Sequence, residues 1–406
     1  MKFAHMADCH IGGWRDPKLR MLGAQAFCRA IDLCIEKSVD FVLISGDLFN
    51  TSLPPIDSLK TAAGKLKELN DRGIPAYIIS GSHDYSPSGK TMLDVLEEAG
   101  LVINVARAHE EQPEEGKLRL KFTVDKKTGA KITGIPGKRA GLDKTFYQML
   151  VRGELEQEPG YKIFMFHALI EELKTKEFAH VDGTPASLLP KGFNYYAGGH
   201  VHIVKDVALP GYGPIVYPGP LFPNSFSELE ALGNGGFYIV DDGKLSFESI
   251  QVHNVHRITA NADHKPPEQV SQEILTYTNT REFVDTIITL RVEGVLASGK
   301  PSDVDFKGIL AALYSRGAYF VMKNTFALKS KEYGEVAVSV PKGEDVEEKV
   351  LKENVGQMPL DGFTVEQQLS LVRQLMQALS VERQEGERVA DFEKRVKESM
   401  EKLLPG

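Results

Sequence analysis

The sequence VDFVLISGDLFN, residues 39–50, is an apolar run that ends on a glycine and a carboxylate, Gly46 and Asp47. Short apolar runs rich in β-branched residues are typical of buried strands. Two other such runs also end on chemically reactive side chains: KFAHMA, residues 2–7, before Asp8, and PAYIIS, residues 75–80, shortly before His83. The repetition indicates that the strand ends of this chain carry its chemistry.

Helix-compatible stretches separate these strands, at residues 21–38, 58–73 and 91–100. Alternation of strands and helices predicts crossover units and a mostly parallel sheet. In such a sheet the loops at the carboxyl ends of the strands lie on one rim, where functional residues collect. We therefore expect Asp8, Asp47 and His83 to lie close together.

The following residues extend the same domain to about residue 255. Residues 106–160 predict short strands, loops and a helix near 143–157, and YKIFMFHALI, residues 161–170, predicts a further strand. FNYYAGGHVH, residues 193–202, is another strand that ends in histidines. A hairpin with a D-D-G turn is expected within residues 235–252. The fold class is therefore α/β with two kinds of sheet in residues 1–255.

Three parts follow this domain. Residues 256–330 show a strand, helix, strand pattern, and residues 331–362 are rich in Lys, Glu, Gly and Pro and predict a linker. Residues 363–406 contain two amphipathic helices, the first with a capping-box signature at Thr364 and Gln367. These helices either cover the core of their own chain or dock on a partner.

Composition limits the possible classes of protein. The chain has 406 residues, of which 42% are hydrophobic and 26% charged, an ordinary globular mixture with room for two or three domains. Apolar stretches fall short of the about 20 residues that span a bilayer, and MKFAHMAD is no targeting signal, so a cytoplasmic protein is expected. Three cysteines without C-x-x-C spacing suggest no disulfide framework. The net charge of −8 argues against a generally basic nucleic-acid-coating protein, but a metal site can supply local positive charge.

The strand-end residues form an ordered set of metal-ligand types. In chain order they are Asp8 and His10, Asp47, Ser82 with His83 and Asp84, His167, and His200 with His202. Each fragment alone is a weak signal, since a chance D-x-H or H-x-H is common. The full set in this order, each fragment after a β-like run, is specific.

Phosphodiester hydrolysis explains why these residue types occur together. Two divalent ions roughly 3.5 to 4 Å apart can activate water and neutralise the phosphoryl charge. A carboxylate between the ions can bridge them, and Asp47 is the natural candidate. His200 and His202 alternate along a strand, so each can serve one ion. His83 is expected to protonate the leaving oxygen, with Asp84 fixing its tautomer.

The pattern D-x-H, GD, GSHD, H and GHVH resembles the calcineurin-like metallophosphoesterases and, within them, the SbcD-type double-strand-break repair nucleases. The resemblance implies a four-layer α/β/β/α sandwich, a small α/β DNA-capping domain, and a C-terminal helix pair that binds an SMC-like coiled-coil ATPase. It also implies a homodimer with 3′-to-5′ exonuclease and single-strand endonuclease activity on DNA ends. Two Mn²⁺ ions per subunit are implied, although other divalent transition metals also suit the ligands.

Carried over residue by residue, the resemblance assigns the ligands of the two ions. Asp8, His10, Asp47 and His202 would bind one ion, and Asp47, Ser82, His167 and His200 the other. This chain has Ser82 where the family usually has Asn, and Asn50 where the repair nucleases often have His. A hydroxyl is a weaker neutral ligand than an amide oxygen, and Asn cannot donate a proton as imidazolium does.

Candidate DNA contacts follow the first motif and lie in the segment IPGKRAGLDK, residues 135–144. They are Trp14, Arg15, Lys138, Arg139 and Lys144. A solvated loop is the alternative for these residues. Two other functions also remain open: a small-molecule phosphodiesterase or phosphatase on the same core, and a DNA-end-binding scaffold with weak catalysis.

Overall fold

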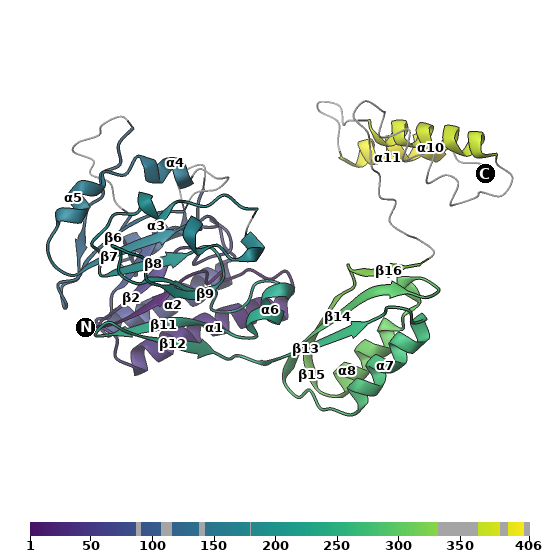
Figure 1. The fold of residues 1–406 in the computed structure, drawn as a ribbon, viewed down its shortest axis with the longest axis horizontal. Helices are drawn as coiled ribbons and strands as arrows, with labels where there is room; N and C mark the ends of the chain where they lie inside the picture. Colours follow the sequence, from purple (N-terminus) through teal and green to yellow (C-terminus); the bar gives the residue numbers. More distant parts are fainter. Residues whose placement is uncertain are drawn as a thin grey trace.

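The computed structural model describes residues 1–86, 91–106, 116–137, 143–178, 180–331, 364–381 and 389–401. Figure 1 shows a large domain, a smaller domain beside it and a pair of helices. Lys138, Arg139 and nearly all of the predicted linker lie outside the described residues.

The first sheet of the large domain has the strand order β12-β11-β1-β2-β3-β4. Strands β1 to β4 run parallel, while β11 pairs antiparallel with β1 and with β12. Asp242 and Gly243 connect β11 to β12 with φ of 46° and 83°, as a two-residue hairpin turn requires. The predicted D-D-G hairpin is confirmed. The strands are β1 Lys2–Met6, β2 Phe41–Ser45, β3 Ala76–Ile79, β4 Ile103–Asn104, β11 Gly235–Asp241 and β12 Lys244–Ile250.

The second sheet has the order β5-β6-β7-β8-β10-β9. Its members are β5 Thr123–Val124, β6 Lys131–Ile135, β7 Lys162–His167, β8 Tyr195–Gly199, β9 Val204–Val207 and β10 Ile215–Pro218. The helix expected near 143–157 is instead two short helices, α4 Asp143–Gln148 and α5 Arg152–Gln157. Leu118 causes the interruption, because its N–H donates to Met149 and its carbonyl accepts from Val151.

The two sheets pack face to face between layers of helices. Phe41 and Leu43 of β2 point into the cluster between the sheets, whereas Val42 and Ile44 pack under the helices on the other face. Burial on both faces explains why the quoted stretch is continuously apolar rather than alternating. The outer helices of the first sheet are α1 Pro17–Glu36, α2 Ile56–Asp71 and α3 Met92–Glu98. The four-layer α/β/β/α fold that the family resemblance implied is confirmed.

The small domain, residues 254–331, has a four-stranded sheet of its own. Its strands are parallel, and its apolar core is separate from those of the large domain. The pattern of the sequence indicated one helix here, but there is a second, α7, ahead of the central strand. The elements are β13 Asn254–Asn261, α7 Pro267–Asn279, β14 Thr286–Leu296, α8 Phe306–Ser315, β15 Ala318–Asn324 and β16 Leu328–Ser330.

The C-terminal helices are α10 Val365–Leu379 and α11 Val389–Glu401, which lie side by side (Figure 1). The expected capping box begins α10: the Gln367 N–H donates to Thr364 Oγ1 at 3.3 Å, and the Thr364 N–H donates to Gln367 Oε1 at 2.8 Å. Among the helices that the structure describes, none is long and apolar enough to cross a bilayer.

Candidate metal centre

The loops after β1 and β2 run alongside each other at the rim of the first sheet. The Asp8 N–H donates to the Gly46 carbonyl at 3.1 Å, and the His10 N–H donates to the Asp47 carbonyl at 3.0 Å. These bonds continue the strand pairing beyond the strand ends. They place the Asp8, His10 and Asp47 side chains at one edge, as the parallel alternation predicted.

The backbone of the rim is strained where the predicted ligands stand. Nine described residues other than glycine have positive φ, and five of them are predicted ligands: Asp8 at 50°, His10 at 41°, Asp47 at 53°, His200 at 101° and His202 at 49°. Residues other than glycine rarely have a positive φ, and such strained backbone is found most often at functional sites. The left-handed turns aim the side chains inward from the strand ends.

Asp47 lies at the centre of the cluster. Its Oδ2 is 3.1 Å from His167 Nε2 and 3.7 Å from His10 Nε2, and its Oδ1 accepts the His83 N–H at 2.7 Å. Ser82, where the family usually has Asn, also contacts this carboxylate, with its Oγ 3.5 Å from Asp47 Oδ2. Asp47 therefore contacts residues assigned to both predicted ions.

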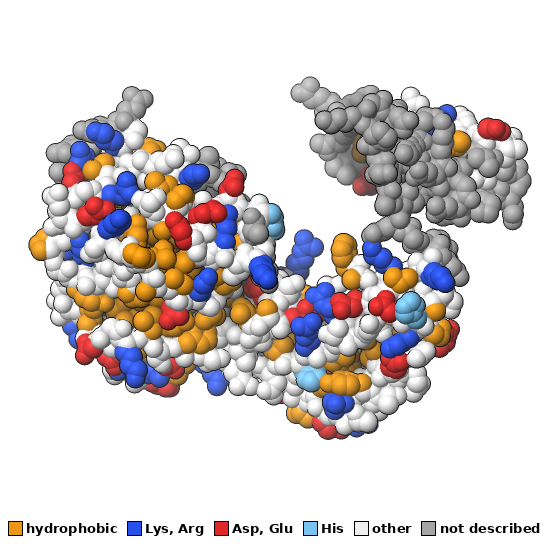
Figure 2. All heavy atoms as spheres, viewed as in Figure 1, with side chains coloured by type: hydrophobic (Ala, Val, Ile, Leu, Met, Phe, Trp, Pro, Cys, Tyr) orange, Lys and Arg blue, Asp and Glu red, His pale blue; other side chains and the backbone are white. Residues whose placement is uncertain are grey.

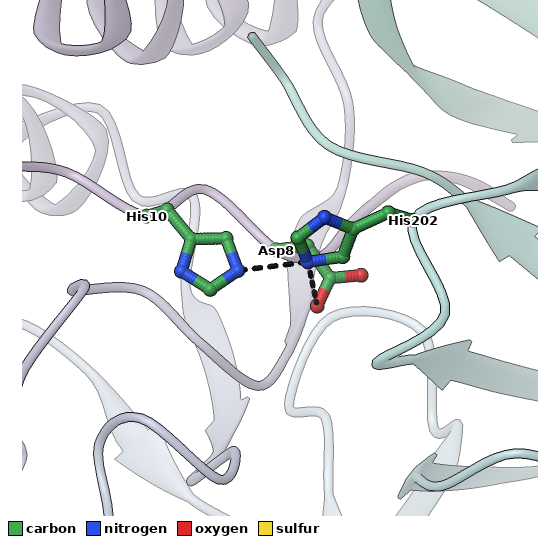
Figure 3. Close-up of side chains that lie close together, drawn as sticks. All are labelled: Asp8, His10 and His202. Atoms are coloured by element: carbon green, nitrogen blue, oxygen red, sulfur yellow. Dashed lines mark hydrogen bonds and ion pairs between the residues drawn. The ribbon is translucent and has the colours of Figure 1, made fainter. Parts of the chain in front are cut away.

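A second group converges beside it, formed by Asp8, His10 and His202 (Figure 3). His202 Nε2 lies 2.9 Å from His10 Nε2 and 3.8 Å from Asp8 Oδ1. The His200 N–H donates to both Asp8 carboxylate oxygens at 3.0 Å, and the His200 ring stands 5.1 Å from that of His167. The loop after β8 is thereby fixed to the loop after β1.

The side chains present fit divalent metal ions. Three overlapping groups have ligand atoms within 4.8 Å of one another: Asp8, His10 and His202; His10, Asp47 and His83; and Asp8, Asp47 and His167. His10 Nε2 and His202 Nε2 lie 2.9 Å apart, and His167 Nε2 lies 3.1 Å from Asp47 Oδ2. Imidazole nitrogens that converge on one another and on buried carboxylates fit the ligand set of divalent metal ions. Mixed imidazole and carboxylate ligands suit Mn²⁺, Fe²⁺ or Zn²⁺ better than Ca²⁺.

The cluster has strongly perturbed pKa values. Burial lowers the pKa of His167, but the charge and hydrogen bond of Asp47 outweigh burial and raise it to about 10. Burial also opposes the charged form of Asp47, yet the imidazoles of His167 and His10 hold the pKa of that carboxyl far below its usual range. His202 has a pKa of about 9, because its bond to Glu228 and the charge of Asp8 outweigh burial.

His83 and Asp84 correct one expectation from the sequence. Asp84 was expected to fix the His83 tautomer, but its carboxylate accepts from the N–H groups of Leu48, Phe49 and Gly81. His83 Nδ1 instead donates to the Asn50 carbonyl at 2.8 Å. The buried Asp84 carboxylate satisfies backbone N–H groups that would otherwise lack an acceptor. The Asn50 carbonyl, on the neighbouring loop, fixes the His83 ring. Asp84 thus secures the loop that carries Asp47.

Small residues make room for the cluster. A Cβ at Gly46 would lie 2.2 Å from His167 Nδ1, and one at Gly81 would lie 2.2 Å from Asp47 Oδ1. His167 Nδ1 donates to the Ser45 carbonyl at 2.8 Å, which leaves Nε2 directed at Asp47. The glycines of the GD and GSHD fragments are therefore required by close approach of the ligands.

Glu228 is a site residue that the sequence reasoning missed. Its Oε1 accepts from His202 Nδ1 at 3.1 Å, on the side of the ring away from His10. A carboxylate that binds the far nitrogen of a ligand histidine fixes its tautomer and orientation. SFSELE, residues 225–230, has Ser and Glu three residues apart, a capping-box pattern that indicates a helix start but not the contact with His202.

The candidate DNA contacts have different surroundings. Trp14 packs on the large-domain core and donates its ring N–H to the Pro223 carbonyl at 3.0 Å, which gives it a structural role. Arg15 is exposed. Lys144 lines a cavity of about 250 Å³ together with His200 and Phe178. Lys138 and Arg139 fall in the part of the chain that the structure does not describe.

Comparison with known proteins matches residues 1–204 to the calcineurin-like phosphoesterase family. The chain is 27% identical over 267 residues to the DNA double-strand break repair protein Mre11 of Methanopyrus kandleri, covering 62% of this chain and 57% of that protein. It is 29% identical over 265 residues to the protein of the same name from Methanococcus maripaludis, covering 62% and 66%. The uncharacterized metallophosphoesterase YhaO of Bacillus subtilis is 24% identical over 271 residues, covering 63% and 61%.

The chain thus spans less than two thirds of the length of each of these relatives. The resemblance to break-repair nucleases that the motifs predicted is confirmed at the level of sequence similarity.

Replacing Asp47 with Asn should abolish binding at both ion sites together, because the carboxylate contacts the ligands of each. We expect Mn²⁺ uptake, measured by calorimetry and by elemental analysis after dialysis, to be lost. Asp206→Asn, on strand β9 outside the cluster, is the matched control. Retention of one tightly bound ion by the Asp47 variant would contradict the shared role.

Metal binding should strengthen as pH rises. His167 and His202, with pKa values of about 10 and about 9, are protonated at neutral pH in the metal-free chain, so binding must displace their protons. The affinity for Mn²⁺ should increase up to about tenfold per pH unit for each displaced proton between about pH 6 and about pH 8. Calorimetric Mn²⁺ titrations in buffers of different ionisation enthalpy measure the number of protons released on binding. An affinity independent of pH would contradict this assignment of protons.

Proposed function

The chain belongs to the calcineurin-like phosphoesterase family, and on this premise we propose that it is a manganese-dependent nuclease that processes DNA ends in double-strand-break repair. The observation that carries the proposal is the position of Asp47 between two overlapping groups of imidazole and carboxylate ligands. A bridging carboxylate of this kind suits two ions and an anionic phosphodiester substrate. The DNA double-strand break repair proteins among the similar proteins favour DNA over a small ester as the substrate.

The ligand residues divide between two ions in this proposal. Asp8, His10 and His202 would hold one ion with Asp47, and His167, His200 and Ser82 would hold the other with the same carboxylate. When bound, the ions supply a water activated at neutral pH and positive charge for the phosphoryl oxygens. Ser82 Oγ already lies 3.5 Å from Asp47 Oδ2, so a hydroxyl takes the place where the family usually has an amide.

His83 provides the proton for the leaving oxygen. The Asn50 carbonyl keeps a proton on His83 Nδ1, so His83 Nε2 is the nitrogen that exchanges a proton with the substrate. The His83 ring stands 4.7 Å from the His10 ring, edge to face, which keeps it beside the ions rather than in the bulk solvent. The contact is made by the backbone carbonyl of residue 50. It is therefore the same whether that residue is Asn, as in this chain, or His, as often in the repair nucleases.

A homodimer is part of the proposal and is supported by an apolar patch on the large domain. Leu53, Ile56 and Val95 are 70%, 82% and 52% exposed, and the bond from the Met92 N–H to the Ser52 carbonyl joins their two segments. Exposed apolar side chains gathered in one place are typical of protein interfaces.

The C-terminal helices support a partner. Leu379 and Val381 are 57% and 42% exposed at the end of α10, although α10 and α11 pack on each other. An amphipathic pair with apolar side chains still exposed is suited to a groove or a coiled coil, and we assign it to an SMC-like ATPase subunit. The proposal includes a cytoplasmic, nucleoid-associated location for this complex, with the small domain contributing to DNA binding.

Cleavage of blunt and 3′-recessed duplexes and of single strands, with and without Mn²⁺, tests the nuclease. We expect degradation that depends on Mn²⁺ and falls by about 10²- to 10⁴-fold in His83→Gln, because general acid catalysis contributes that much. His264→Gln, at an exposed position of the small domain, is the control. Hydrolysis of mononucleotide esters with DNA left intact would instead indicate a small-molecule phosphodiesterase. Stoichiometric end binding without cleavage would indicate a scaffold.

Introducing a charge into the apolar patch should separate the subunits. The unsubstituted chain is expected at twice the chain mass of 44.9 kDa, and Ile56→Glu with Val95→Glu at the chain mass itself. Light scattering after size exclusion gives both masses. Val284→Glu, at a position 68% exposed on the small domain, should remain dimeric. A monomeric unsubstituted chain would rule out this interface.

A further inference from the structure

Helix α6, Phe226–Leu232, touches the metal centre and the small domain at once. It lies at the edge of the large domain nearest to the small domain (Figure 1). Two of its carboxylates point to different partners, Glu228 to the His202 ring and Glu230 to Arg291 of strand β14. A seven-residue helix thus stands between a predicted metal ligand and another domain.

Glu228 has two tasks. Its Oε1 accepts from His202 Nδ1 at 3.1 Å, and its Oε2 accepts the Asn224 N–H at 2.7 Å at the start of the helix. The Glu228 N–H donates to Ser225 Oγ at 3.2 Å, which completes the cap. The same carboxylate therefore fixes the helix start and the His202 ring, so the two cannot shift independently.

Glu230 binds the small domain through a two-pronged ion pair. Arg291 Nε lies 3.1 Å from both carboxylate oxygens, and Arg291 Nη2 lies 2.5 Å from Oε2. Arg257 of β13 adds a contact at 3.6 Å. The Glu230 side chain is only 7% exposed and that of Arg291 22%, so water screens this pair less than a surface pair.

Helix α6, which carries both Glu228 and Glu230, has little freedom to deform. Leu229 is fully buried in the large-domain core, and the Arg291 guanidinium lies 5.2 Å from the Phe226 ring centre. Because Leu229, Glu228 and Glu230 are all held by contacts, the short helix α6 moves as a rigid unit. A shift of β14 would pull on Glu230 through Arg291, and the helix would pass the movement to Glu228.

We propose that α6 couples the position of the small domain to the hold of the large domain on the ion bound by His202. Arg291, Glu230 and Glu228 are positioning residues in this chain of contacts, and His202 is the group they act on. Displacement of the small domain by a bound substrate would alter the metal site without touching it. The inference rests on the proposed metal centre, and it concerns ion affinity rather than the identity of the substrate.

Calorimetric Mn²⁺ titration of the full-length chain tests the coupling. Glu228→Gln should weaken one of the two sites by about tenfold, as loss of a carboxylate behind a ligand histidine does. Glu230→Gln and Arg291→Gln should each weaken the same site by about threefold, a size typical of residues that act through a contact network. Since both break one link, the double variant should lose no more than either single variant.

The visible spectrum of bound Co²⁺ supplies a readout that a purely structural role would not change. We expect the Glu230 and Arg291 variants to shift the absorption of the His202 site alone. Glu273→Gln, which removes a small-domain ion pair with Lys265 and leaves the Glu230–Arg291 pair in place, should change neither spectrum nor affinity. Unchanged affinity in both single variants, or losses that add in the double variant, would overturn the coupling. An unsubstituted chain that binds ions but leaves DNA intact would count against the proposed nuclease and not against the coupling.

Discussion

The structure depends on keeping one carboxylate, Asp47, charged in an almost water-free position. Burial strongly disfavours a bare carboxylate, and the imidazoles of His167 and His10 with the His83 N–H provide the compensation. Those partners come from the ends of strands in two sheets, so the sheets must meet at the same rim. The glycines at 46 and 81 follow from the same demand, since a side chain there would occupy the space of the ligands.

Much of this arrangement could be predicted because it is periodic and local. Strand ends that alternate with helices imply one rim, and Asp8, Asp47 and His83 lie there as expected. The roles of Asp84 and Glu228 could not be predicted, because they depend on which backbone donors and ring nitrogens are left unpaired after folding. The break between α4 and α5 was missed for a similar reason, since it comes from a distant partner, Leu118.

The two departures from the family pattern have different weight in three dimensions. At position 50 the group that meets His83 is the backbone carbonyl, which every residue carries, so the asparagine side chain leaves that contact unchanged. At position 82 the side chain itself approaches Asp47, so a hydroxyl replaces an amide at the point of contact. The departure at position 82 therefore has the larger effect on the ligand set of the candidate metal centre.

The left-handed backbone at Asp8 and Asp47 has an evolutionary consequence. With φ of 50° and 53°, these positions exclude β-branched side chains and favour glycine, aspartate and asparagine. Mutational drift at either position is thereby channelled towards asparagine, a residue that keeps the turn but removes the charge. A descendant of this chain could lose its ions in one step while its fold persisted, and the divergence of binding proteins from enzymes would begin at these turns.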